Sequence, residues 1–380
     1  MERRRQKHQV TSIEKVSKKL KGDKILFLTT LFLVVLGLVV IADASAPLAL
    51  STFGNSFYFV KQQLISAIIG FLALIILSNI HFSFWKKLSP IIFAVSIISL
   101  IVVLLPGVGS KLLGARRWIT IGGFNFQPSE FVKISLALFI AYLYDRKAPY
   151  WWYLATIGVL IGLIMLEPDL GTTIVVSSIG FVQIFLSGFP IMYMFGILGG
   201  GGVLGTLLIL ISKYRRERLF TFLSSIVDPI GKTADQASGS AYHIRQILIA
   251  VGSGGLFGVG LGQSRQKFLF LPETATDSIF AIIAEEIGFI GCFVLIGVFV
   301  YYIFRLIRIA KNAPDEFSTI FTIGVAAWIA SQMFFNIGSM IALVPLTGIP
   351  LPFISYGGTS LIAILMAIGI VLNISKYANK

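Results

Sequence analysis

The stretch Gly254–Phe289 reads GGLFGVGLGQSRQKFLFLPETATDSIFAIIAEEIGF. It gathers glycines, amides, cations and carboxylates, and it then runs directly into an apolar segment of a largely apolar chain. Such a polar cluster is costly beside a membrane, so this stretch predicts a functional site. We predict that Asp277, at the junction of loop and helix, is its chemical centre.

The composition predicts an all-α integral membrane protein. Of the 380 residues, 56% are hydrophobic and only 13% are charged, whereas soluble domains average about 25% charged residues. The single cysteine, Cys292, lies in an apolar run and excludes a disulfide framework or a cysteine metal site. In a membrane protein, the net charge of +14 indicates orientation and binding to anionic lipid, so no nucleic-acid partner is expected.

Ten apolar runs approach the ~20 residues that cross a bilayer. An even number of spans places both termini on one side, and the basic tail 1–24 makes that side the cytoplasm. Residues 25–376 are thus predicted to be one polytopic domain of a plasma-membrane protein, followed by a cytoplasmic tail at 377–380. The first run mimics a signal peptide, but its length favours a retained helix. The runs are 25–41, 57–80, 88–106, 129–144, 152–166, 170–186, 190–212, 277–302, 319–343 and 356–374.

Two outer segments, about 107–128 and 213–276, are predicted to be large loops, the second between helices seven and eight. Both carry cations, and loops this long are usually functional. Within the second loop, Tyr242–Val251 is predicted to be a short amphipathic segment that dips into the membrane interface. In the seventh helix, small residues about four apart predict close helix packing; they are Gly196, Gly200, Gly201 and Gly205.

Two interpretations of Asp277 remain open. Aspartate is a favoured N-cap, so Asp277 is a candidate cap for the helix that follows. Alternatively, a partly buried carboxylate facing a substrate pocket can act as a general base. Three more carboxylates lie near this helix start, opposite Gln266 and Lys267; they are Glu273, Glu285 and Glu286.

Other polar groups also have two interpretations each. Arg116 and Arg117, beside Trp118, predict either an interfacial anchor or a clamp for phosphate. Glu130 and Lys133 share one helix face, which predicts a structural ion pair or the lining of a polar cavity.

Three further features lie near helix ends. Glu167-Pro168-Asp169 breaks a helix, and Asp169 is a candidate cap for the next one. The segment 350–360 contains Ser355, Gly357 and Gly358, whose amides and small side chains predict an anion site or close backbone packing. Asn336 is predicted to hydrogen-bond across helices.

Five blocks of sequence resemble those of a known protein family. GARRWI, QPSEFVK, EPDLGT, the opening stretch and NIG…VPLTGIPLPFISYGGTS follow one another along residues 25–375. They are similar, in the same order, to the hallmark blocks of the SEDS family (shape, elongation, division and sporulation: FtsW, RodA, SpoVE). The basic N-terminal tail and the SYGGTS ending resemble the FtsW/SpoVE branch more than RodA.

The resemblance implies a peptidoglycan glycosyltransferase that polymerises lipid II on the outer face of the bacterial plasma membrane. It implies a class B penicillin-binding protein as partner, with other division or elongation membrane proteins. The family's essential aspartate, in a P-E-x-x-T-D block, falls on Asp277, although Ala275 stands where the usual block has histidine.

On this resemblance, we expect Asp277 to be the base in an inverting transfer. A divalent cation, Mg²⁺ or Mn²⁺, is the one cofactor considered, and its ligands are unknown. The expected substrate-binding residues are Arg116, Arg117, Glu130, Lys133, Arg245, Gln246, Ser264, Gln266, Lys267, Ser355, Gly357 and Gly358.

Two other functions remain as alternatives. Helices broken at 167–169 and 350–358 suit a lipid II flippase, although the polar residues gather at one face rather than the midplane. A scaffold that docks division proteins without chemistry would leave the carboxylates and cations of 254–289 unexplained.

Overall fold

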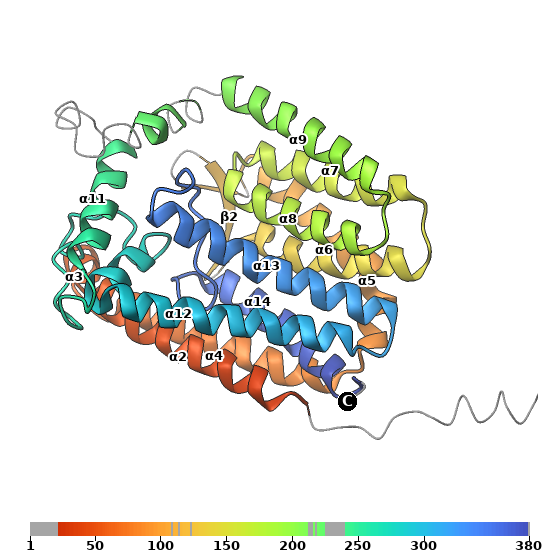
Figure 1. Cartoon of the computed structure of the whole chain (residues 1–380), viewed down its shortest axis with the longest axis horizontal. Coiled ribbons are helices and arrows are strands. Elements are labelled where there is room, and N and C mark those ends of the chain that lie inside the picture. The colour runs from red at the N-terminus through yellow and green to blue at the C-terminus, as the bar shows by residue number, and fades with distance from the viewer. Residues whose placement is uncertain are drawn as a thin grey trace, which may run out of the picture.

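The computed structural model describes residues 22–107, 109–112, 115–121, 124–211, 216, 219–224 and 240–378. Most of these residues form helices that run side by side in one bundle (Figure 1). The predicted all-α membrane fold is confirmed. Residues 1–21 and 379–380 of the predicted cytoplasmic tails lie outside the described residues, as do parts of both predicted outer loops.

Each predicted apolar run coincides with a helix in the described part of the chain. By length and composition, six helices there can cross a membrane: α2, α4, α5, α12, α13 and α14. Helices α7 and α8 are apolar but shorter, so the number of ten crossings stays a prediction. The helices are α2 (Lys24–Ala44), α4 (Tyr58–Asn79), α5 (Phe82–Leu104), α6 (Pro128–Asp145), α7 (Tyr150–Leu166), α8 (Leu170–Leu186), α9 (Ile191–Ile211), α12 (Ile279–Lys311), α13 (Glu316–Met340) and α14 (Gly358–Ser375).

The core lies along α14 and α13. Nearly every side chain of α14 is buried, and this helix packs mainly against α4, while α13 packs between α6, α8 and α12. Gly369 lets α14 approach α4 closely, because a Cβ there would lie 2.8 Å from the carbonyl oxygen of Leu74. Small residues at helix crossings provide such contacts in membrane proteins, where lipid removes the hydrophobic drive between helices.

Helix α9 does not meet the expectation of close packing. A Cβ added at Gly196, Gly200, Gly201 or Gly205 would meet no atom within 4 Å. The helix lies along one edge of the bundle (Figure 1). The prediction that these glycines serve close packing within the chain is therefore wrong.

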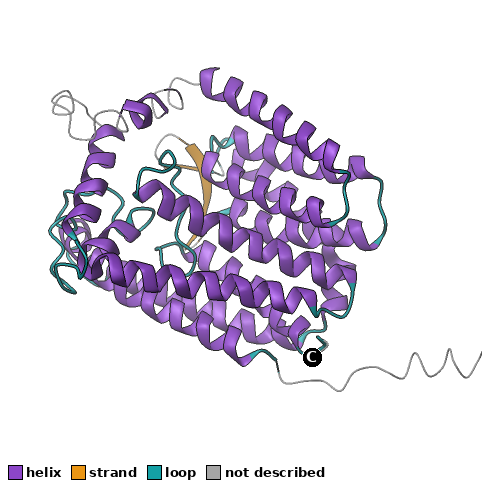
Figure 2. Cartoon of the chain, viewed as in Figure 1, coloured by secondary structure: helices purple, strands orange, loops and turns teal. Residues whose placement is uncertain are grey.

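Loops and strands cluster at the end of the bundle where the site residues lie (Figure 2). The first predicted outer loop forms an antiparallel sheet of β1 (Ser110–Leu112), β2 (Ala115–Ile121) and β3 (Phe124–Phe126), with β2 central. Two short helices also lie at this end, α3 (Ala46–Phe53) and α11 (Ser240–Ser253). The predicted amphipathic segment Tyr242–Val251 lies within α11, and its contact with the membrane interface stays a prediction. The sequence did not predict the sheet.

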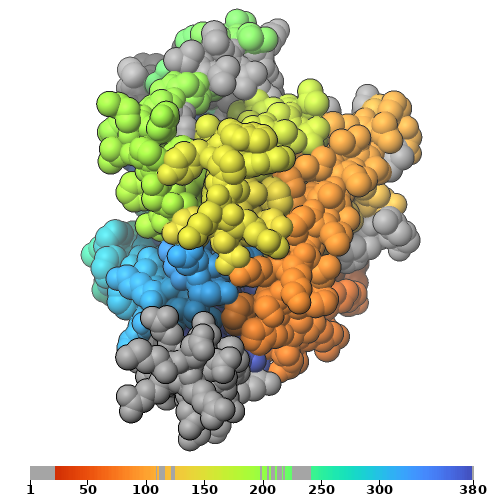
Figure 3. Space-filling model, turned by 90° about the vertical axis from the view of Figure 1, so that its right-hand side faces the viewer, coloured from red at the N-terminus to blue at the C-terminus, as the bar shows by residue number. Residues whose placement is uncertain are grey.

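The opposite end of the bundle, seen in Figure 3, is where α4–α5, α6–α7 and α12–α13 connect. Ion pairs join these connections: Lys86 Nζ lies 2.5 Å from Asp145 Oδ1, and Arg305 Nε lies 2.7 Å from Asp23 Oδ2. Asp23 also caps α2, so the start of the first helix is fixed to the end of α12.

Candidate active site

The site is built on a break in α12. Gly288 has φ 66° and ψ −171°, which interrupts the helix and leaves its neighbours' backbone groups without helical partners. The loop after α11 supplies those partners. Val259 and Gly260 donate to the carbonyls of Glu285 and Glu286, and Phe289 and Ile290 donate to the carbonyls of Gly255 and Leu256.

These backbone contacts explain two of the glycines in the opening stretch. A Cβ at Gly258 would collide with the main chain of Glu286, and one at Gly288 would collide with the main chain of Gly258. Glycine is required where two backbones approach this closely.

The carboxylates of Glu285 and Glu286 hold the next part of the loop. Ser264 Oγ donates to Glu285 Oε2 at 2.5 Å, and the amides of Arg265 and Gln266 donate to the same carboxylate at 3.0 and 3.4 Å. The Ser264 amide donates to Glu286 Oε1 at 3.2 Å. Ser264 and Gln266, expected to bind substrate, thus both help to fix the loop. Their contact with substrate stays a prediction.

Lys267 is buried between two carboxylates. Its Nζ lies 2.6 Å from Asp43 Oδ1 on α2 and 3.0 Å from Glu286 Oε1, and the residue is 4% exposed. Burial disfavours the ammonium, but the hydrogen bonds to Asp43 and Glu286 outweigh it and raise the pKa of Lys267. The lysine expected to hold pyrophosphate is thus engaged in an ion-pair cluster in this conformation.

Asp277 lies two residues before the first residue of α12. The N-cap of α12 is Ser278, whose side chain makes no capping hydrogen bond, so the interpretation of Asp277 as the N-cap is wrong. The half-buried carboxylate accepts a hydrogen bond from Thr276 Oγ1 at 3.1 Å, and Thr276 also donates to Glu273. Oδ2 faces Gly348, where an added Cβ would lie 3.6 Å away.

Two contacts fix the main chain around Asp277. Asn336 Nδ2 on α13 donates to the carbonyls of Asp277 and Ile349, at 2.8 Å each. The Tyr356 amide donates to the Ala275 carbonyl at 2.8 Å. The predicted cross-helix role of Asn336 is confirmed. It ties the Asp277 turn to the segment that precedes α14.

Helix α11 is fixed to the same turn. His243 Nε2 lies 2.8 Å from the hydroxyl of buried Ser278, the residue after Asp277. Arg245 and Gln246 are half-buried on the same helix, two and three residues farther along. The structure therefore brings α11, which carries two expected substrate-binding residues, to the Asp277 turn.

The arginines of β2 differ in their surroundings. Arg117 donates to the carbonyls of Glu167 and Pro168, at 2.9 and 2.5 Å, and so holds the α7–α8 turn. Asp169 caps α8 by accepting from the Thr172 amide at 3.0 Å, as predicted. Arg116 is half-buried on the same strand. The expected phosphate clamp thus has one of its two guanidinium groups directed at the protein's own backbone.

Glu130 and Lys133 form the predicted ion pair, with Lys133 Nζ 2.7 Å from Glu130 Oε1. Both residues are almost fully buried, and Lys133 Nζ also lies 5.6 Å from the ring centre of Trp328. Glu130 Oε2 and both polar atoms of the Gln332 amide have no hydrogen-bond partner within the described part of the chain. The pair is therefore confirmed, and its second interpretation, the lining of a polar cavity, stays a prediction.

Gln63 of α4 holds the segment before α14. Its Nε2 donates to the Ser355 carbonyl at 3.3 Å, and its Oε1 accepts from the Gly357 amide at 3.1 Å. Ser355 Oγ accepts from the Leu351 amide, and Gly358 begins α14. One amide of the predicted anion site is thus occupied by Gln63.

The structure therefore brings the Asp277 turn, α11, the Glu285–Glu286 cluster and the 341–357 segment together. Sequence reasoning did not predict the roles of Gln63, Asp43 and His243. Among the described residues, no three His, Cys, Asp or Glu side chains could jointly hold a metal ion.

Comparison with known proteins decides the family. The model of the cell cycle protein family FtsW/RodA/SpoVE matches residues 23–380. The chain belongs to this family. It is 40% identical to stage V sporulation protein E of Bacillus subtilis, over 95% of this chain and 99% of that protein. It is 37% identical to a probable peptidoglycan glycosyltransferase FtsW of Trichlorobacter lovleyi, over 93% of both chains. The expected likeness to the FtsW/SpoVE branch is confirmed.

Two solved structures share the fold. One, from a study of how a peptidoglycan synthase complex coordinates polymerization and crosslinking, matches with a TM-score of 0.75 at 27% identity. That match covers 94% of this chain and 98% of the other. The rod shape determining protein RodA of Thermus thermophilus matches with a TM-score of 0.69 at 26% identity, over 95% and 99% of the two chains. A multi-pass membrane protein is therefore confirmed.

Proposed function

We propose that this chain polymerises peptidoglycan by joining the disaccharides of lipid II molecules. Glycosyltransferase activity on peptidoglycan is supported by family membership and by relatives named probable peptidoglycan glycosyltransferase FtsW. The observation that carries the site is the half-buried Asp277 carboxylate, on a turn fixed by α11, by α13 and by the segment before α14.

Asp277 acts as the general base in this proposal. It takes the proton from the 4-hydroxyl of the acceptor sugar while that oxygen forms a bond to C1 of the donor sugar. The bond from C1 to undecaprenyl pyrophosphate breaks in the same step, and an α-linked donor gives a β-linked product. Such a displacement needs one base, and partial burial suits a carboxylate to that task.

The departing pyrophosphate needs positive charge, because negative charge builds up on its bridging oxygen. We assign this role to Arg116, Arg117, Arg245 and Lys267, with Gln246 as a hydrogen-bond donor. Arg117 and Lys267 also contact protein groups in this conformation. Glu130, Lys133, Ser264, Gln266, Ser355, Gly357 and Gly358 act by holding the site in shape. A divalent cation would reach the site bound to the pyrophosphate, so assays are run with and without EDTA.

We further propose that both termini lie in the cytoplasm and that Asp277 lies at the outer face. Lipid II then keeps its tail in the bilayer while its sugars meet at the surface. A class B penicillin-binding protein is the proposed partner, together with other division or elongation proteins. The likeness to a chain from a complex that coordinates polymerization and crosslinking supports this partner.

The test is polymerisation of purified lipid II by the chain with its penicillin-binding partner. Asp277→Asn should lower the rate by about 10²-fold or more, since general-base catalysis contributes roughly 10²–10⁴-fold. Glu273→Gln is the matched control, because this exposed carboxylate lies on the same turn and also contacts Thr276. It should keep most of the activity.

Two outcomes would contradict the proposal. Full activity of Asp277→Asn with loss in Glu273→Gln would move the base to Glu273. Absence of glycan from the wild type, together with lipid II flipping in vesicles, would favour the transporter.

A further inference from the structure

Ion pairs connect α2 and α12 at both ends of their contact. At one end Arg305 of α12 binds Asp23, and at the other Lys267 links Asp43 of α2 to Glu286 of α12. Asp23 and Asp43 are twenty residues apart, which corresponds to about 30 Å of helix. The hydrocarbon core of a bilayer is ~30 Å thick, so the two clusters have the separation expected of charged groups at its two borders.

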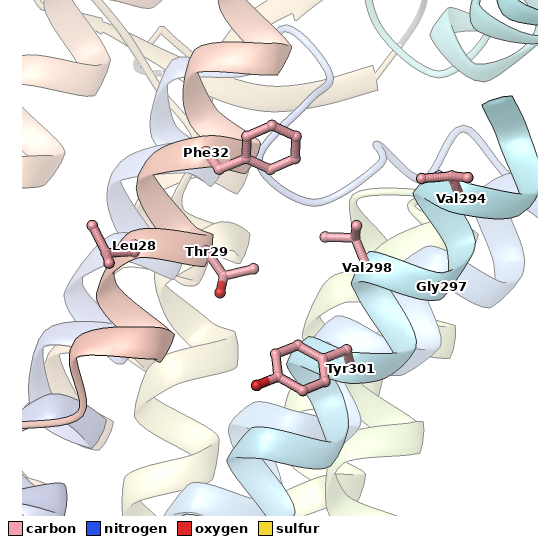
Figure 4. A pocket seen from close by; sticks show the side chains of 7 residues that line it. All are labelled: Leu28, Thr29, Phe32, Val294, Gly297, Val298 and Tyr301. Atoms are coloured by element: carbon pink, nitrogen blue, oxygen red, sulfur yellow. The ribbon is translucent and has the colours of Figure 1, made fainter.

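The surface between the clusters is apolar and exposed. A groove of about 550 Å³ lies there between α2 and α12 (Figure 4). Phe32 on one wall and Val294 on the other are more than half exposed. Large apolar side chains exposed at this depth have acyl chains as their natural neighbours.

The loop that completes the α12 break lies on the hydrocarbon side of the outer cluster. The carbonyls of Gly255 and Leu256 accept from Phe289 and Ile290, which follow Glu286 in the direction of Arg305. The loop amides of Gly258, Val259 and Gly260 all have backbone acceptors. Non-helical backbone at membrane depth requires such pairing, because lipid offers no hydrogen bonds.

The side chains at the tip of this loop are apolar and exposed. Phe257 is 80% exposed, Leu261 is 78% exposed and Leu256 is 62% exposed. They continue the exposed apolar surface of α12. The Leu256 carbonyl accepts a hydrogen bond from the Ile290 amide, and the neighbouring Phe289 is 64% exposed. One apolar surface therefore runs from the span onto the loop.

We propose that Gly254–Leu261 is a re-entrant loop whose Leu256, Phe257 and Leu261 side chains insert among the acyl chains of the outer leaflet. The chain then continues into Ser264–Lys267, which binds Glu285 and Glu286. Helix α12 begins at Ile279, seven residues before Glu286 and roughly 10 Å away along the helix axis, and Asp277 lies two residues before Ile279. The lipid contact thus sets the height of Asp277 above the bilayer. This inference does not depend on the proposed reaction.

The test measures the depth of single positions in the full-length chain. Cys292→Ser removes the one cysteine, and Phe257→Cys or Leu261→Cys then carries an environment-sensitive fluorophore in phosphatidylcholine–phosphatidylglycerol vesicles. Gln263→Cys is the water-facing control, an exposed position beside the polar pocket formed with Arg265 and Glu285. Phe293→Cys, on the exposed face of α12, is the lipid-facing control.

At positions 257 and 261 we expect strong quenching by doxyl lipids labelled near the headgroup, since interfacial segments sit about 5–10 Å below that boundary. Iodide in the buffer should quench the fluorophores at positions 257 and 261 several-fold less than the fluorophore at position 263. Only variants that elute as monodisperse protein are compared. Two loop positions are labelled so that the test still works if one of the two variants misfolds.

Iodide quenching at 257 and 261 as strong as at 263, without doxyl quenching, would overturn the proposal. Protection from iodide that appears only when the penicillin-binding partner is added would also overturn it, and would assign this surface to protein docking.

Discussion

The side-chain amide of Asn336 and the main-chain carbonyl of Asp277 are joined by a 2.8 Å hydrogen bond. The same amide donates to Ile349, and Asn336 is 1% exposed. Asn336 is therefore a positioning residue: it sets the backbone from which the Asp277 carboxylate projects, without itself facing the substrate. The bond joins α13 to a turn 59 residues earlier in the chain.

Asn336→Ala should lower the rate of lipid II polymerisation about 10–100-fold. The substitution removes the Asn336 donor from one buried and one partly buried carbonyl, which costs roughly 1–3 kcal/mol, and each 1.4 kcal/mol corresponds to a factor of ten. The measurement is the turnover of folded protein at saturating lipid II, because displacement of the base affects turnover more than substrate binding.

Asn373→Ala is the matched control for Asn336→Ala. Asn373 is equally buried and also bonds main-chain groups, Ser78 and Phe82, but it lies at the opposite end of the bundle. It should lower the melting temperature to a similar degree and leave the specific activity of the folded fraction unchanged. Equal losses of activity in the two variants would mean that Asn336 only stabilises the fold and does not position Asp277.

Gly288→Ala should destabilise the break in α12. A backbone at φ 66° and ψ −171° is essentially restricted to glycine, and a side chain there costs about 1–3 kcal/mol in strain. The expected result is a lower melting temperature in detergent. Gly297→Ala in the same helix is the control. The added Cβ would meet no described atom within 4 Å, so the melting temperature of this variant should be unchanged or slightly higher than that of the wild type. Equal melting temperatures for the two variants would mean that the break is not a fixed feature of the fold.

Local sequence was sufficient to predict the helices and one buried ion pair. Apolar runs identify spans because a bilayer selects for length and composition within a single segment. Glu130 and Lys133 could be paired because positions three apart share a helix face. The Asp169 cap could be predicted for a similar reason, since the accepting carboxylate and the donating Thr172 amide are three residues apart.

The contacts that shape the site are not local. Asp43 and Lys267 are 224 residues apart, and Gln63 and Gly357 are 294 apart, so no periodicity joins them. The sheet at 110–126 was missed because two of its three strands have only three residues, which are too few to show an alternation pattern. Arg117 was predicted to clamp phosphate because guanidinium chemistry alone does not distinguish a phosphate from two nearby carbonyls.

Lys267→Met tests whether this lysine holds the fold or the substrate. Without the ammonium, the carboxylates of Asp43 and Glu286 face each other in a buried site, and breaking a buried pair costs roughly 3–5 kcal/mol. The double variant Lys267→Met/Glu286→Gln removes this repulsion and should recover much of the melting temperature. Lys86→Met is the control at the other end, where the partly exposed pair with Asp145 should contribute at most about 1 kcal/mol.

Activity of that double variant separates the two roles of Lys267. If the lysine serves the fold, activity should return with stability. Restored stability with polymerisation still absent would instead show that Lys267 acts on the substrate, as the sequence predicts.

Glu167 gives the protein a predictable dependence on pH. Its carboxyl group is fully buried, and neither oxygen has a hydrogen-bond partner in the described part of the chain. Burial raises the pKa of Glu167 to about 8, the negative charge of Asp169 adds to this, and Arg117 opposes it. The folded state therefore favours the neutral acid, whereas the unfolded chain ionises near pH 4.5. A raised carboxyl pKa lowers stability progressively as pH rises from about 4.5 to 8, and the loss then levels off.

Glu167→Gln should accordingly match the wild type in melting temperature near pH 4.5 and exceed it increasingly up to pH 8–9. The full difference is on the order of a few kcal/mol, because one pKa unit corresponds to about 1.4 kcal/mol. Glu316→Gln, which removes an exposed carboxylate in the first turn of α13, is the comparison variant. Melting curves in detergent between pH 4.5 and 9 measure this. If the difference between Glu167→Gln and the wild type stays constant across that range, Glu167 is ionised in the fold and must have a partner that neutralises it.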